Sequence, residues 1–205
     1  MKELKQKKTI IIITGCPGSG KSRWADRIKK NIADIKLLSY DDIKEKNWDR
    51  FGFENAIDKD LLNKKSLDEF YQALDEEMKI GGPILIEYPF YERHRNSIID
   101  LIEKYSYYPI TLYLTGDLEI IYFRSLQRDS SGTRHSGHLL NSYNKNSSTI
   151  FSPESETKLS LEDFKKMCRE KNYNIQIGKT FTLDVSNLSF IDNNAEDILG
   201  KIISL

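Results

Sequence analysis

The chain has 205 residues, 39% of them hydrophobic, which is enough for one well-buried domain over residues 1–205 and too few for two. Its 31 basic and 31 acidic residues give a net charge of zero, so no global positive field attracts nucleic acid, which is an allowed but not a favoured partner. No apolar stretch approaches the roughly 18 residues that span a membrane, and the lysine-rich N-terminus lacks the apolar segment of a secretory signal, so we expect a cytoplasmic protein without a membrane partner.

The first predicted element is a buried strand over residues 9–14, which leads into a phosphate-binding loop. Four consecutive isoleucines at 10–13 are typical of a central parallel strand that is covered on both faces. The following residues match G-x-x-x-x-G-K-[ST] at every position: Gly15, Cys16, Pro17, Gly18, Ser19, Gly20, Lys21 and Ser22. The glycines let backbone N–H groups surround an anion, while Lys21 can serve the β- and γ-phosphates and Ser22 a magnesium ion. The loop therefore predicts a nucleoside triphosphate, ATP or GTP, bound with Mg²⁺.

A helix begins inside this loop, because Trp24, Ile28 and Ile32 recur at intervals of four residues. The N-terminal end of a helix carries partial positive charge, which strengthens the predicted anion site. A short second strand is predicted over residues 36–40, and we expect it to lie nearest the first strand.

Two carboxylates, Asp41 and Asp42, follow the second strand, at the sheet edge where open α/β proteins bind ligands. We expect Asp41 to face the acceptor and to orient or deprotonate its hydroxyl. Asp42 is equally well explained as the cap of a helix that starts at Ile43.

Residues 43–80 are expected to form an insertion that builds the acceptor pocket. The mixed polar pattern of residues 43–65 predicts a short helix and a loop. The segment Ser66-Leu67-Asp68-Glu69 has the form of a capping box, which predicts that the next helix starts there. Its apolar stripe ends before Gly81-Gly82-Pro83, which closes the helix.

A third strand is predicted over residues 84–88, and Glu87 lies at its end. A carboxylate in such an apolar run is costly without a cation. We therefore expect Glu87 to contact magnesium or substrate, with a salt bridge to a lysine or arginine as the alternative. His94, between Arg93 and Arg95, is most simply a surface residue.

A helix around residues 98–105 and a fourth strand over 110–114 precede an arginine-bearing helix capped by Asp117. Arg124 and Arg128 lie one turn apart on it, and a polar loop with Arg134 follows. We expect a lid over about residues 128–142 that brings guanidinium groups to the phosphates, although a solvated helix face is the alternative.

His135 and His138 lie within the predicted lid, and we expect them to contact phosphate or substrate. Two histidines three residues apart with no third ligand make a poor zinc site. Beyond the lid, a helix near 160–172, a fifth strand over 180–185 and a final helix near 194–203 complete the pattern. Strands alternating with helices predict an α/β fold, a five-stranded parallel sheet with helices on both faces.

Together the phosphate loop, the Asp41-Asp42 pair, Glu87 and the arginine helix with its lid resemble the small P-loop kinases. These include zeta toxins, chloramphenicol phosphotransferase and the kinase domain of phage polynucleotide kinase. The likeness runs from about residue 9 to 140. It is strongest to a group of bacterial ATP-binding kinases with an Arg-His-x-Gly-His lid, which corresponds to residues 134–138.

The resemblance to polynucleotide kinases implies two further roles. In that family the first acid of the pair is the general base, which corresponds to Asp41, and a basic residue three places on binds the substrate's phosphate, which corresponds to Lys44. The chain departs from that family at Ser39-Tyr40, in its lid, and in having no phosphatase segment.

The sequence therefore favours an ATP- and Mg²⁺-dependent kinase that phosphorylates a hydroxyl of a small molecule or nucleotide. In it Lys21, Arg124 and Arg128 neutralise charge, Arg134 binds the nucleotide, and Ser22 and Glu87 hold magnesium. A polynucleotide 5′-hydroxyl kinase is the alternative with the same chemistry. A regulatory or non-catalytic nucleotide-binding switch is the alternative of another class, although no Asn-Lys-x-Asp element for guanine is complete.

Overall fold

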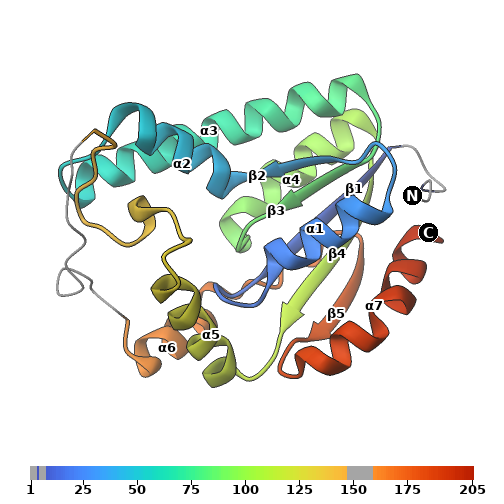
Figure 1. Cartoon of the computed structure of the whole chain (residues 1–205). Coiled ribbons are helices and arrows are strands. Elements are labelled where there is room, and N and C mark those ends of the chain that lie inside the picture. The colour runs from blue at the N-terminus through green and yellow to red at the C-terminus, as the bar shows by residue number, and fades with distance from the viewer. Residues whose placement is uncertain (1–3, 5–7, 147–158) are drawn as a thin grey trace.

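A parallel sheet forms the centre of the computed structural model, which describes Leu4, residues 8–146 and residues 159–205, and helices cover both faces (Figure 1). Within these residues five strands are found: β1 (Thr9–Gly15), β2 (Lys36–Ser39), β3 (Ile84–Glu87), β4 (Tyr108–Thr115) and β5 (Lys179–Asp184). Their order is β2-β3-β1-β4-β5, and every neighbouring pair is parallel. The predicted α/β class and sheet are confirmed.

The four isoleucines of β1 are fully buried because helices pack on both sides of the strand. Ile11 and Ile13 belong to one core cluster, which includes residues of α1 (Lys21–Asn31) and α7 (Leu188–Ile203). Ile10 and Ile12 point to the opposite face, where the second cluster holds residues of α3 (Ala56–Ile80) and α4 (Glu92–Tyr105). Side chains alternate along a strand, so an unbroken apolar run fits a strand between two helical layers.

The prediction that β2 lies nearest β1 is wrong, because β3 lies between them. Ile13 of β1 and Ser39 of β2 are both in register with Glu87 of β3. The crossover through α1 carries the chain past the position that β3 later fills. This order places Glu87 between the phosphate loop that follows β1 and the carboxylates that follow β2.

The second strand ends one residue earlier than predicted. Helix α2 (Tyr40–Phe51) starts at Tyr40, and the side chain of Ser39 caps it by accepting a hydrogen bond from the Asp42 N–H at 3.3 Å. The expectation that Asp42 caps a helix starting at Ile43 is therefore wrong. Asp41 and Asp42 lie in the first turn of α2, where the helix dipole favours negative charge.

The capping box at Ser66 does not start a helix. Helix α3 starts at Ala56, and Asn55 caps it by accepting hydrogen bonds from Ile57 N–H at 2.9 Å and Asp58 N–H at 3.0 Å. Ser66 is buried inside the helix, and its hydroxyl donates to the Leu62 carbonyl at 2.7 Å. The polar stretch before Ser66 is therefore helical as well.

The remaining elements follow the prediction closely. Asp117 caps α5 (Leu118–Ser130), and the predicted lid contains one short turn, η1 (Ser136–His138). Helix α6 (Leu161–Lys171) agrees with the expected position, and α7 starts six residues earlier than predicted. Within the described ranges, no helix combines the length and apolar character that crossing a bilayer requires.

His94 is a correction, because its side chain is 1% exposed and not on the surface. It lies in the first turn of α4, where Nδ1 accepts a hydrogen bond from the Tyr91 N–H at 3.2 Å. Burial, together with the neighbouring Arg93 guanidinium, lowers the pKa of His94 to about 4. The imidazole is thus neutral at physiological pH and has a structural position at the helix start.

Candidate active site

The phosphate loop forms a cradle for an anion at the N-terminus of α1. Gly20 caps this helix with φ of 89°, no side chain caps the N–H groups, and the first turn carries no acidic residue. A Cβ at Gly20 would meet nothing within 4 Å, so the space beside the helix start is open. The Ser19 hydroxyl is buried and has no hydrogen-bond partner among the described residues. These features fit a bound phosphate group.

Gly18 attaches the cradle to α5. A Cβ at this position would lie 2.6 Å from the Ile121 carbonyl oxygen and 2.9 Å from Ser125 Cβ, and φ is 85°. Both the close approach and the left-handed backbone require glycine here. The loop and the arginine-bearing helix are therefore held in direct contact.

Lys21 is buried over the loop, and its ammonium group donates to the carbonyl oxygens of Gly15 at 3.2 Å and Cys16 at 3.1 Å. Burial lowers the pKa of Lys21, while the carboxylates of Glu87 and Asp41 oppose this effect. The protonation of Lys21 thus depends on two acids, Glu87 at the end of β3 and Asp41 just after β2. The third N–H of the ammonium group makes no hydrogen bond to these two carbonyl oxygens.

Ser22 and Glu87 lie together, as a shared magnesium site requires. The Ser22 hydroxyl is 3.3 Å from both carboxylate oxygens of Glu87. Burial raises the pKa of Glu87, and Lys21 offsets this only in part. No lysine or arginine of the described chain has a nitrogen within 4.0 Å of this carboxylate, so the salt-bridge alternative has no partner there.

Asp41 contacts Lys44, with 2.6 Å between Oδ1 and Nζ. Burial raises the pKa of Asp41, but the positive groups of Lys44, His138 and Lys21 outweigh burial, and the pKa lies below its ordinary value. Asp41 is therefore ionised at neutral pH. Its charge also acts on the pKa values of Lys21 and Glu87, whereas its predicted role toward an acceptor stays a prediction.

Lys44 is more enclosed than a surface phosphate ligand would be. Its ammonium group lies 5.0 Å, 5.4 Å and 5.2 Å from the ring centres of Tyr40, Trp48 and Tyr88, respectively. The side chain is 10% exposed. This aromatic cage holds Lys44 against Asp41, so the geometry fits a residue that positions Asp41. The phosphate-binding role implied by the resemblance stays a prediction.

Two lid arginines converge on one carboxylate. Asp129 Oδ1 lies 2.8 Å from Arg128 Nη2 and 3.2 Å from Arg134 Nε. Arg128 acts electrostatically on Lys21, and the pKa of Arg134 is lowered by burial and by Arg128. Arg128 thus lies beside the phosphate loop, where Pro17 shares a cavity wall with it, and Arg134 is joined to Arg128 through Asp129. Their contact with a nucleotide stays a prediction.

Arg124 does not join this pair. Its guanidinium group donates to the carbonyl oxygens of Val185 and Ser186, the latter at 2.9 Å, at the C-terminal end of β5. Although Arg124 and Arg128 are one turn apart, their side chains have different partners. The catalytic role of Arg124 stays a prediction, and its observed contacts join α5 to the end of β5.

The predicted lid packs on α2 through both of its histidines. Nε2 of His135 lies 3.0 Å from Asp49 Oδ1, and Nε2 of His138 lies 2.8 Å from Glu45 Oε1. Trp48, on the same helix, has ring contacts with both histidines. In this structure the histidines therefore hold the loop on α2, and a contact with phosphate or substrate stays a prediction.

Gly137 lies directly against Trp48, which suggests a sharp test of this packing. A Cβ at position 137 would overlap the indole ring and would lie 3.0 Å from His135 Nδ1. We expect Gly137→Ala to lower the free energy of unfolding by about 1 to 3 kcal/mol and to reduce activity, because the loop must shift. Urea denaturation and a kinetic assay measure both effects. Ser136→Ala is the matched control, and a Gly137→Ala protein with wild-type stability and activity would show that this contact is unimportant.

Sequence patterns did not predict the partners of the lid or of Cys16. Asp49 and Glu45 appear in the sequence only as scattered charges of α2. Cys16 lies in the same core cluster as Cys168 of α6, and the interaction of the two thiols lowers the pKa of Cys16 and raises that of Cys168. Both cysteines are buried free thiols. No local spacing rule connects such distant residues.

Comparisons with known proteins agree with the fold. No family model matches the chain. A candidate kinase from Chloroflexus aurantiacus is similar over 98% of this chain and 100% of its own, with 20% identity and a TM-score of 0.73. A gluconokinase from Sinorhizobium meliloti covers 97% and 95%, with 14% identity and a TM-score of 0.54. Kti12 from Chaetomium thermophilum, solved with ADP-AlF3, covers 96% and 100%, with 14% identity and a TM-score of 0.56.

These likenesses extend over almost the whole chain and show that it shares its fold with these three proteins. Sequence identity of 20% or less does not carry an activity from one protein to another, because one fold supports many functions. The chemistry must therefore be argued from the side chains of this chain.

Proposed function

We propose that this protein is an ATP- and Mg²⁺-dependent kinase that transfers the γ-phosphoryl group to a hydroxyl of a small molecule or nucleotide. One observation carries the proposal: the ionised carboxylate Asp41 follows Ser39, which is in register with Glu87, so it lies at the sheet edge beside the phosphate loop, and its charge acts on the pKa values of Lys21 and Glu87. A protein that only binds nucleotide needs the phosphate loop and a metal site. An acid on the acceptor side of that loop is the additional part that a phosphotransferase needs.

The residues take distinct roles in this proposal. Positive charge that stabilises the negative phosphoryl group during transfer comes from Lys21, Arg128 and Arg134. Asp41 orients the acceptor hydroxyl or accepts its proton. Lys44 holds Asp41 in place through the 2.6 Å contact. The structural neighbours from Chloroflexus aurantiacus and Sinorhizobium meliloti, named as a kinase and a gluconokinase, are consistent with this chemistry.

The residues at the loop also fit magnesium. Mg²⁺ prefers oxygen ligands and is commonly held by one or two protein groups together with phosphates and water. Ser22 and Glu87 supply these oxygens, 3.3 Å apart. When bound, the ion neutralises charge on the β- and γ-phosphates.

Replacing Glu87 with glutamine should separate stability from activity. Burial raises the pKa of Glu87, so its ionisation disfavours the folded state once the pH exceeds the raised pKa, whereas the penalty is absent below the unfolded pKa. We expect Glu87→Gln to raise the Tm of the metal-free protein at about pH 8 but not at about pH 4. We also expect it to raise the Mg²⁺ concentration needed for activity by about 10- to 100-fold.

Thermal denaturation in EDTA at both pH values and a magnesium titration of activity check this prediction. Glu103→Gln, which changes an exposed acid of α4, is the control. A Glu87→Gln protein that is less stable at high pH and has an unchanged magnesium requirement would contradict the metal role.

The proposed reaction is tested by incubating the protein with γ-labelled ATP, Mg²⁺ and two acceptor sets. One set is a panel of small hydroxyl compounds and nucleotides, and the other is RNA with 5′-hydroxyl ends. We expect labelled small-molecule monoesters. If label appears on RNA ends alone, the acceptor is a polynucleotide and not a small molecule. Binding of ATP without transfer to either set would favour a nucleotide-binding switch.

A further inference from the structure

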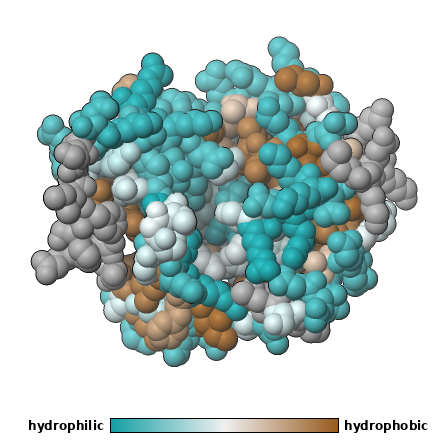
Figure 2. Space-filling model, viewed as in Figure 1, coloured by the Kyte–Doolittle hydropathy of each residue, from teal (hydrophilic) through white to brown (hydrophobic). Residues whose placement is uncertain are grey.

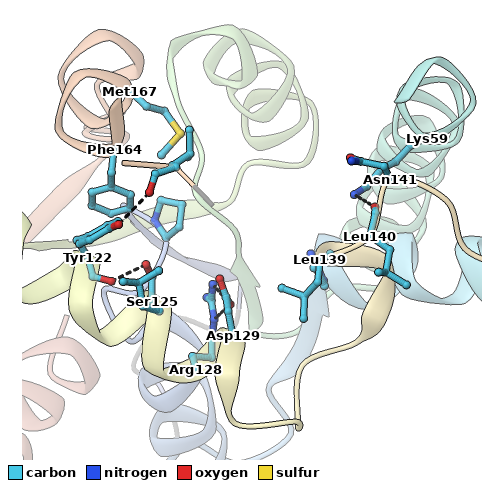
Figure 3. A pocket seen from close by; sticks show the side chains of 14 residues that line it. Lys59, Tyr122, Ser125, Arg128, Asp129, Leu139, Leu140, Asn141, Phe164 and Met167 are labelled. Carbon is cyan, nitrogen blue, oxygen red and sulfur yellow. Dashed lines mark hydrogen bonds and ion pairs between the residues drawn. The ribbon is translucent and has the colours of Figure 1, made fainter. Parts of the chain in front are cut away.

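A cavity of about 290 Å³ lies beside the phosphate loop, between two parts of the molecule that are distant in sequence. Figure 3 shows Tyr122, Phe164 and Met167 from α5 and α6 on one side, and Leu139, Leu140 and Lys59 on the other. Pro17 of the phosphate loop also lines it. The cavity therefore has direct access to the loop, and most of its wall is apolar or aromatic.

Lys59 is the notable polar group of this wall. It is half-buried on α3, and its ammonium group donates to the Leu140 carbonyl oxygen at 3.1 Å. It lies 5.5 Å and 5.2 Å from the ring centres of Trp48 and Phe53. Among the described residues, no carboxylate oxygen is within 4.0 Å of its nitrogen, unlike Arg128, which is paired with Asp129.

The surroundings of Lys59 leave positive charge uncompensated. Burial lowers the pKa of Lys59, and the cations Lys44 and Arg134 lower it further. Lys44 is already paired with Asp41, and Arg134 with Asp129. Among the described residues, one carbonyl oxygen is the acceptor of this half-buried ammonium group and no acid lies beside it, so it is suited to an anionic ligand.

The cavity borders the proposed reacting groups without being lined by them. Pro17 of the phosphate loop and Arg128 line it. Lys59 and Lys44 both lie against the Trp48 ring, and Lys44 pairs with Asp41 at 2.6 Å. A molecule in the cavity would therefore contact Lys59 and the phosphate loop near the acid that would orient a hydroxyl.

The outer surface argues for a small ligand. Figure 2 shows a mainly hydrophobic surface over α5 and α6, where Phe123 is 56% exposed and Leu159 48% exposed. A polynucleotide needs a positive track for its backbone. A volume of about 290 Å³ suits a metabolite, because pockets for drug-sized ligands begin at about 300 Å³.

We propose that this cavity is the acceptor site of the proposed kinase, and that it takes a small hydroxyl compound with a ring or apolar part and an anionic group, which Lys59 binds. The inference rests on the proposed function. It differs from the expected pocket within residues 43–80, because that segment contributes Lys59 while α5, α6 and the predicted lid, together with Pro17 and Leu159, provide the other lining residues.

The three methionines of the chain provide a test that does not depend on catalysis. Met167 lines the cavity, whereas Met78 is fully buried in the other core cluster. The protein is labelled with ¹³C at the methionine methyl groups, saturated with ADP and Mg²⁺ to fill the phosphate loop, and titrated with benzyl phosphate or benzyl alcohol. We expect benzyl phosphate to move the Met167 signal and leave the Met78 signal unchanged.

Lys59→Gln should weaken benzyl phosphate binding by about 10-fold or more and leave benzyl alcohol binding unchanged, because only the charged hydrogen bond is lost. Lys64→Gln is the matched control, since Lys64 lies on the same helix, is 70% exposed and pairs with Asp60. Wild-type affinity for benzyl phosphate in Lys59→Gln, or an unmoved Met167 signal, would overturn the proposal.

The two proposals fail separately. A shifted Met167 signal without transfer of label from ATP would refute the kinase and leave an anion-binding cavity. Transfer of label to a small hydroxyl compound with Met167 unmoved would support the kinase and refute this acceptor site.

Discussion

Replacing Lys21 with methionine is expected to lower the rate of phosphoryl transfer by about 10²- to 10³-fold while changing nucleotide affinity by less than about 10-fold. Backbone N–H groups and the α1 N-terminus already hold the phosphates in the ground state. The ammonium group of Lys21 contacts two loop carbonyls and lies near Asp41 and Glu87, where charge develops during transfer. Its loss should therefore affect the transition state more than binding.

Single-turnover kinetics and titration with a fluorescent ATP analogue measure the two effects separately. Lys29→Met is the control, because Lys29 is exposed in the last turn of the same helix. Equal losses of affinity and rate would show that Lys21 contributes only to nucleotide binding.

Asp41→Asn is expected to lower transfer by about 10²- to 10⁴-fold with little change in ATP affinity. The asparagine keeps the shape of the side chain but cannot accept a proton or hold the charge that pairs with Lys44 at 2.6 Å. Asp42→Asn, at the exposed neighbouring position, should have little effect. The same kinetic and binding assays check both variants. A greater loss of the transfer rate in Asp42→Asn than in Asp41→Asn would assign the proposed role to Asp42.

Local patterns were sufficient for the phosphate-loop motif and the strand before it. The glycine spacing of residues 15–22 indicates the loop through contacts between near neighbours, and the isoleucines before it indicate a strand buried on both faces. The loop and the strand depend on short segments whose geometry is nearly independent of the rest of the chain. Ser22 and Glu87 lie 3.3 Å apart through a tertiary contact, and their sharing of a metal stays a prediction.

The parts that could not be predicted depend on tertiary contacts. The position of β3 between β1 and β2 follows from how crossovers pack, and chain order does not determine it. Ser66 satisfies a capping pattern, yet Asn55 provides the cap and Ser66 hydrogen-bonds within the helix. Arg124 and Arg128 share a helical face but reach different partners. A long side chain can reach several partners from one helix position, and tertiary packing determines which partner it contacts.

The proposed acceptor cavity shows the same limit. Lys59 is one lysine in a charged helix when viewed in sequence, and its proposed role depends on its contacts with Leu140, Trp48 and Phe53. Similarly, Lys44 is three residues from Asp41, but the aromatic cage that encloses it includes Tyr88 from the end of β3. Cavities lined by α5, α6 and the lid have no local sequence signal.

Asp41 is proposed to make this phosphate loop a site of transfer to a hydroxyl, and ³¹P NMR tests this role directly. Mg·ATP is incubated with a pool of small hydroxyl metabolites and either the wild-type protein or Asp41→Asn. We expect wild-type protein to convert the γ-phosphoryl group into a phosphate monoester, and Asp41→Asn to bind ATP but form almost none. Inorganic phosphate as the sole product, formed at the same rate by both proteins, would contradict this role.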